Sequence, residues 1–66
     1  MMFRVGQMKG DNDAAVLTRA MRTVEPDAMV DVDVDARTVK VDSWLFAEEF
    51  LVAFADAGYD VKLVER

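Results

Sequence analysis

The feature that most limits the fold of this chain is an alternation of side chains in residues 28–43, which read AMVDVDVDARTVKVDS. Valine alternates first with aspartate and then with threonine, lysine and aspartate. A period of two is typical of β-strands that have one buried face and one face in water. Two antiparallel strands that join near residues 35–37 explain the pattern best. We therefore expect a sheet whose valine face is covered by helices.

A helix is predicted before these strands, from about Asp13 onward. Its apolar residues recur three or four positions apart, as on one face of a helix: Leu17, Ala20, Met21 and Val24. Asp11 or Asn12 is expected to cap its start, where acidic residues also favour the positive end of the helix dipole. Pro26 closes the element.

A second helix is predicted after the strands, with Ser43 as its cap. The residues expected on its inward stripe again have helical spacing: Phe46, Phe50, Ala53, Phe54 and Ala57. Gly58 suits the left-handed residue that commonly ends a helix. Trp44 falls off the inward stripe, so it either lies as a lid over the core edge or contributes to an exposed apolar flank that docks a partner.

Short strands are predicted near both ends of the chain, over about residues 2–7 and from Tyr59 to Leu63. The order is then β-α-β-β-α-β. This order predicts an α+β fold, the ferredoxin-like sandwich, with a four-stranded antiparallel sheet and two helices on one face. Residues 1–66 are expected to form a single domain, because a chain this short has room for only one core.

Composition excludes several kinds of chemistry. The chain has no cysteine and no histidine, so thiolate nucleophiles, imidazole bases and the usual ligands of soft metals are absent. A net charge of −5 argues against nucleic acid and favours a basic protein partner or a cation. No apolar run approaches the roughly 20 residues of a membrane span, and the start of the chain lacks a signal-peptide pattern, which favours the cytoplasm.

Residues along almost the whole chain match a known pattern: Met8, then Leu17, Ala20 and Met21, then Val32 and Val34, then Ala53, Ala57, Gly58 and Tyr59. In these positions the chain resembles a heavy-metal-associated domain, the copper-chaperone type of module. That family carries a G-M-x-C-x-x-C turn after its first strand. The resemblance places Gly10 and Asp13 at the two metal-binding cysteines and Gln7 at the glycine. It therefore implies a degenerate member that lacks the usual copper chemistry.

The turn GQMKGDND, residues 6–13, admits three interpretations. In the structural one, Met8 faces inward and an acid or amide caps the helix. In the second, oxygen ligands from Asp11 and Asp13, with Met8 nearby, bind a divalent cation such as calcium or magnesium weakly. In the third, the helix start and Lys9 hold an anion. Both aspartates would repel that anion, so we rank it last.

We predict a non-catalytic heavy-metal-associated-like module that serves in protein interaction or regulation. It would need no cofactor, and we expect a monomer or weak dimer with a protein partner and no membrane or nucleic acid. The alternative is metal binding through the oxygen ligands of the first turn. Catalysis has little support because Glu48 and Glu49 point in different directions on a helix.

The acidic row Asp31, Asp33 and Asp35 is either a solvated face or a surface for a basic partner or a cation.

Overall fold

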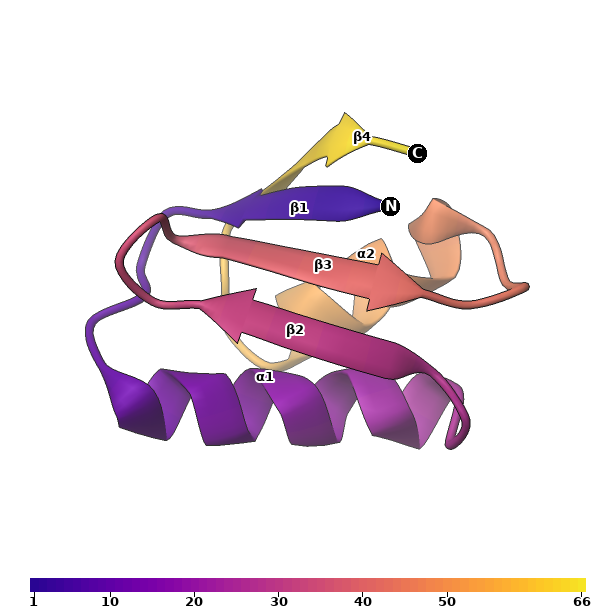
Figure 1. Cartoon of the computed structure of the whole chain (residues 1–66), viewed down its shortest axis with the longest axis horizontal. Helices are drawn as coiled ribbons and strands as arrows, with labels where there is room; N and C mark the ends of the chain where they lie inside the picture. The colour runs from indigo at the N-terminus through magenta and orange to yellow at the C-terminus, as the bar shows by residue number, and fades with distance from the viewer.

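Six elements follow one another in the predicted order in the computed structural model, which describes residues 1–66 (Figure 1). They are β1 (Met2–Val5), α1 (Asp11–Val24), β2 (Met29–Asp33), β3 (Thr38–Asp42), α2 (Ala47–Asp56) and β4 (Val61–Glu65). The predicted β-α-β-β-α-β order and the ferredoxin-like fold are confirmed. The first strand ends at Val5 and not near residue 7, and Tyr59 lies just before the last strand.

The four strands form one sheet in the order β2-β3-β1-β4, and every neighbouring pair is antiparallel. β1 therefore lies in the middle of the sheet, between β3 and β4 (Figure 1). The register pairs Phe3 with Val39 on one side and with Leu63 on the other. This placement brings both ends of the chain to neighbouring strands.

One face of the sheet carries the core, and both helices pack against it. Alternate residues of β1 and β3 are fully buried there, and helices α1 and α2 contribute the residues that cover them. The largest fully buried side chains are Phe3, Phe50, Phe54, Leu17, Met21, Val5, Val39 and Val41. The rings of Phe3 and Phe54 are tilted by 59° with centroids 4.9 Å apart, a favourable aromatic arrangement. The predicted layering is thereby confirmed.

The start of α1 differs from the prediction. The helix begins at Asp11, so Gly10 is the N-cap residue and Asp13 stands in the first turn. The Asp13 carboxylate accepts a hydrogen bond from the Gly10 N–H, which is the reciprocal half of a capping box. The expectation that Asp11 or Asn12 caps the helix is wrong, because both residues already belong to it.

The start of α2 also differs. The helix begins at Ala47, with Phe46 at the N-cap position, and the Glu49 carboxylate accepts a 3.1 Å hydrogen bond from the Phe46 N–H. Ser43 is therefore not the cap; its Oγ accepts a 3.2 Å bond from the Leu45 N–H within the preceding loop. Phe46 lies before the helix with an extended backbone, so its side chain is not on the inward stripe that was predicted for it. The side chain is exposed to water.

The remaining turns agree with the sequence. The β2–β3 connection turns at residues 34–37, where the Asp33 Oδ1 accepts a 3.0 Å hydrogen bond from the Ala36 N–H and Arg37 has a φ of 57°. Gly58 has a φ of 89°, the left-handed conformation expected of the residue that ends α2. None of the helices combines the length and apolar character needed to cross a bilayer.

Candidate functional site

The β1–α1 loop, residues 6–10, lies at one end of the sheet, beside the segment that leads from α2 into β4 (Figure 1). Met8 anchors this loop, since only 4% of its surface is exposed and it belongs to the core cluster. Its inward position agrees with the structural interpretation of the turn. The Met8 thioether thus packs among apolar side chains.

Asp13 is the centre of a hydrogen-bond cluster at this end. Its Oδ2 accepts a 2.7 Å bond from the Lys9 N–H and a 3.2 Å bond from the Gly10 N–H. Its Oδ1 accepts a 2.5 Å bond from the hydroxyl of Tyr59. One carboxylate therefore joins the loop, the first turn of α1 and the segment that precedes β4.

These hydrogen bonds shift the pKa values of both side chains. The Tyr59 hydroxyl, and then the Lys9 N–H, stabilise the ionised carboxylate, so the pKa of Asp13 lies below its ordinary value. The same bond to the ionised carboxylate raises the pKa of Tyr59, because the phenol must keep its proton to donate. At neutral pH the pair is an ionised acceptor and a neutral donor.

Two further hydrogen bonds join the loop to residue 60. The Gln7 Oε1 accepts a 2.9 Å bond from the Asp60 N–H, and the Gly6 N–H donates a 3.1 Å bond to the Asp60 carbonyl. The sequence analysis did not predict these hydrogen-bonding roles of Gln7 and Tyr59. Two signals pointed to the positions: Tyr59 matches the closing segment of the family pattern, and Gln7 stands where the family usually has glycine.

The predicted cation ligands are not gathered into one site. Asp11 is exposed on the first turn of α1, Met8 is buried, and Asp13 is engaged by the three donors described above. The structure contains no group of three or more acidic, histidine or cysteine side chains that could hold a metal ion. The donor set does not fit a soft metal, because it offers no thiolate.

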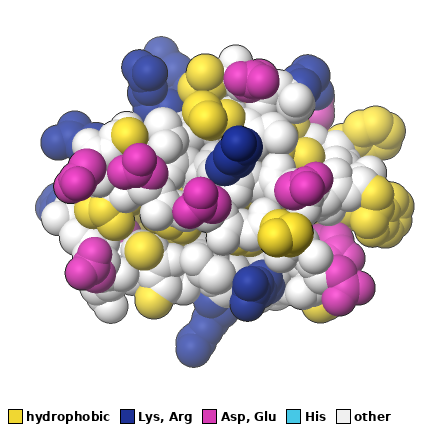
Figure 2. Space-filling view, viewed as in Figure 1, with side chains coloured by type: hydrophobic (Ala, Val, Ile, Leu, Met, Phe, Trp, Pro, Cys, Tyr) yellow, Lys and Arg dark blue, Asp and Glu magenta, His cyan; other side chains and the backbone are white.

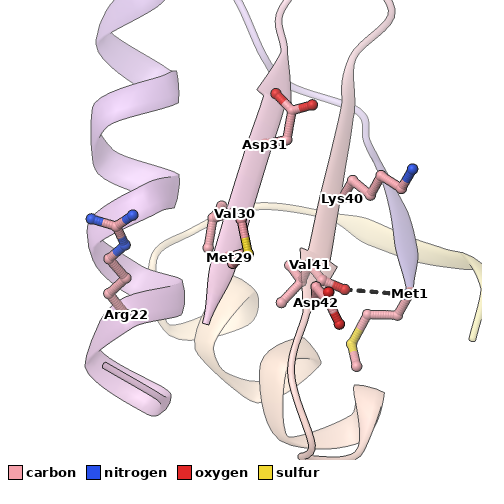
Figure 3. Close-up of a pocket in the computed structure, with 8 residues that line it drawn as sticks. All are labelled: Met1, Arg22, Met29, Val30, Asp31, Lys40, Val41 and Asp42. Carbon is pink, nitrogen blue, oxygen red and sulfur yellow. Dashed lines mark hydrogen bonds between the residues drawn. The ribbon is translucent and has the colours of Figure 1, made fainter. Parts of the chain in front are cut away.

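Asp31 and Asp33 of the acidic row are exposed on β2, on the open face of the sheet, whereas Asp35 lies in the turn that follows β2. Asp31 pairs across the ladder with Lys40, while Asp33 holds the β2–β3 turn. A surface pocket of about 450 Å³ lies beside them, and Figure 3 shows Asp31 and Lys40 on neighbouring strands and Arg22 on α1. Side chains of both charges line this pocket: the cations Arg22 and Lys40 and the acids Asp31 and Asp42. It therefore has no single charge preference for a ligand.

Solved structures of known proteins have the same fold as this chain. No family model and no curated protein matches the chain. Among solved structures, the trimeric Cu1 form of the copper chaperone Atx1 from Synechocystis PCC6803 is 29% identical with a TM-score of 0.89, over 94% of this chain and 98% of that one. A gold binding protein is 27% identical with a TM-score of 0.90, over 94% and 95% of the two chains. The resemblance deduced from the sequence is confirmed.

Proposed function

We propose that this chain, which has the heavy-metal-associated fold of copper chaperones without their cysteines, is a non-catalytic module for protein interaction or regulation. The fold and the similarity to metal-binding proteins support a binding role over an enzymatic one. Two candidate carboxylates for catalysis have structural partners: Glu48 forms an ion pair with Arg66, and Glu49 caps α2. Neither is paired with a second acid across a cleft.

The hydrogen bond between Gly10 and Asp13 carries this proposal. The resemblance places these two residues where the family has its metal-binding cysteines. Here the Gly10 N–H donates to the Asp13 Oδ2 at 3.2 Å, so the two positions bond to each other. Tyr59 and Lys9 donate to the same carboxylate. The N–H groups of Lys9 and Gly10 thus have a carboxylate acceptor within the protein, and no ion is needed to satisfy them.

Thiolate chemistry cannot be replaced by the residues present. Soft monovalent copper selects sulfur ligands, whereas carboxylate oxygens suit hard cations. The nearby thioether of Met8 lies in the core. A copper-transfer role of the family type is therefore not what this loop supports.

The alternative is weak binding of a divalent cation by Asp11 and Asp13, with Met8 nearby. Its support is that Asp11 is exposed and lies two residues before Asp13, whose pKa is lowered. A cation at Asp13 must compete with the hydroxyl of Tyr59 and the N–H groups of Lys9 and Gly10 for the same oxygens. Such binding would open the loop, and calcium would still need six to eight oxygens.

An NMR titration separates the two functions. The amides of residues 6–15 are followed while copper(I), zinc, calcium or magnesium is added. Protein interaction without metal predicts no saturable shifts with any of the four ions. Saturable shifts with calcium or magnesium that disappear in the Asp11→Ala, Asp13→Ala variant would favour the alternative. Tight, stoichiometric copper(I) or zinc binding at neutral pH would contradict both.

A further inference from the structure

Two aromatic side chains project into water at the end of the molecule far from the β1–α1 loop. Trp44 is 83% exposed and Phe46 is 76% exposed, and both belong to the connection between β3 and α2. Figure 1 shows that connection at the opposite end of the sheet from the β1–α1 loop, and Figure 2 shows hydrophobic side chains protruding there. We call these two residues the aromatic pair.

The backbone that carries the aromatic pair is held in place by its neighbours. Leu45, between the two, packs against the core. Its N–H donates to the Ser43 Oγ, the Phe46 N–H donates to the Glu49 carboxylate, and the Glu49 N–H donates to the Phe46 carbonyl. Ordering a loop on binding costs free energy, so a loop that is already ordered can bind with less loss.

The segment that carries the aromatic pair is strongly acidic. Residues 41–49 contain three acidic residues and no lysine or arginine: Asp42, Glu48 and Glu49. Arg66 is paired with Glu48 through two 3.0 Å hydrogen bonds, and the Met1 ammonium donates to the Val41 carbonyl at 3.0 Å. Acidic side chains lie beside the protruding hydrophobic ones in Figure 2. The surface around the aromatic pair is thus complementary to positive charge.

We infer that the aromatic pair is the docking site for a short basic segment of a partner protein, one with an apolar anchor flanked by lysine or arginine. This inference rests on the proposed function, since it supplies the interaction surface. Exposed tryptophan and phenylalanine can each bury about 150–250 Å², and a cation over an indole face adds attraction. Together they provide less than the roughly 800 Å² per partner of a standard protein interface, which suits a peptide.

Two other occupants are disfavoured by charge. A second copy of the chain would bring another −5 charge and the same acidic residues against the first. A membrane surface rich in anionic lipid would also repel the acids around the pair. A basic segment alone uses both the aromatic surface and the acidic surroundings.

The single tryptophan of the chain makes the test direct, because Trp44 fluorescence reports on this site alone. The probes are three synthetic helical peptides: one with leucine anchors and lysines, one with the lysines replaced by glutamate, and one with the leucines replaced by serine. We expect a saturable blue shift only with the first peptide. Added salt should lower the affinity of that peptide. Phe46→Ala should reduce its affinity about tenfold.

Val52→Ala is the matched control, because Val52 is 62% exposed but lies on α2 away from the pair. Equal binding of the lysine and glutamate peptides, or equal loss in the two variants, would overturn the inference. The inference would also be overturned by a dimer in sedimentation that dissociates in the Phe46→Ala variant. A blue shift with anionic vesicles in place of the peptide would overturn it as well. Copper(I) binding at residues 6–15 with peptide binding intact would overturn only the metal-free function.

Discussion

Tyr59 and Asp13 lie 46 positions apart in the chain and are joined by a 2.5 Å hydrogen bond from the phenol to the carboxylate. The antiparallel pairing of β4 with β1 brings them together, since Val61 stands opposite Val5. The bond connects the segment after α2 to the first turn of α1. It occupies the end of the molecule where the family resemblance places the metal loop.

Replacement of Tyr59 by phenylalanine should loosen this end without disturbing the core. The ring is kept and only the hydroxyl is lost, so Asp13 loses the donor that most favours its ionised form. We expect the pKa of Asp13 to rise toward its ordinary value and the amides of residues 6–13 to exchange faster with solvent. Carbon-detected NMR titration of the carboxyl measures the first effect. An unchanged Asp13 titration would contradict the assigned bond.

The stability of the domain should depend on pH through Asp13. Its pKa in the folded state is lowered from 3.8, so the unfolded chain binds the proton more readily than the folded one. The stabilisation is fully present above 3.8 and is lost as the pH falls through the lower folded value. The pKa of Glu48 is also lowered, chiefly by its hydrogen bond to Arg66, so its contribution to stability is likewise lost at low pH. Urea unfolding should show a weaker acid dependence in Asp13→Asn than in the native chain.

Tyrosine titration gives the opposite dependence. The pKa of Tyr59 is raised above 10.0 by its bond to ionised Asp13 and by partial burial. Its contribution to stability is present below 10.0 and is lost as the pH rises through the folded value. Ultraviolet absorbance should follow this ionisation directly, because Tyr59 is the only tyrosine. Asp13→Asn should move the titration back toward 10.0.

Two phenylalanine substitutions should differ sharply in their effect on folding. Phe54 is fully buried against Phe3, and Phe54→Ala should cost about 3–5 kcal/mol of unfolding free energy. That loss is a large share of the about 5–15 kcal/mol typical of a domain, so the variant should unfold at a much lower temperature. Phe46→Ala should change stability by less than about 0.5 kcal/mol, because its side chain lies in water. Similar losses measured by thermal unfolding would show that Phe46 packs inward.

Two glycine substitutions should differ for a backbone reason. Gly58→Ala should destabilise the domain by about 1–2 kcal/mol, because the φ of 89° is strained for a residue with a Cβ atom. Gly10→Ala should have a much smaller effect, since the backbone is extended there and a Cβ atom would meet nothing within 4 Å. Thermal unfolding of the two variants side by side tests the difference.

The same open space at Gly10 allows the family chemistry to be restored. The double variant Gly10→Cys with Asp13→Cys recreates two cysteines separated by two residues. It should bind copper(I), while the native chain and Asp13→Asn should not. Competition with a chelator that changes colour on copper(I) binding measures this. A double variant that folds but does not bind copper would show that the loop geometry differs from that of the family.

Local patterns predicted most of the elements. The valine alternation located β2 and β3, and the spacing of Phe50 and Phe54 located the buried stripe of α2, because such periodicities follow from the geometry of each element. Helix starts were less predictable, since a residue such as Phe46 fits the helical spacing whether or not the helix has begun. Trp44 proved to be exposed and not a lid, and only packing could decide that.

The order of the elements, most of the core and the absence of thiolate and imidazole chemistry could all be predicted from the sequence. These depend on residue type and on spacing within a few positions. The tertiary structure alone decided that Tyr59, Gln7 and Asp13 close the first loop and that the aromatic pair projects from the opposite end. The reason is the strand order β2-β3-β1-β4, which joins distant segments through backbone pairing that no local pattern encodes.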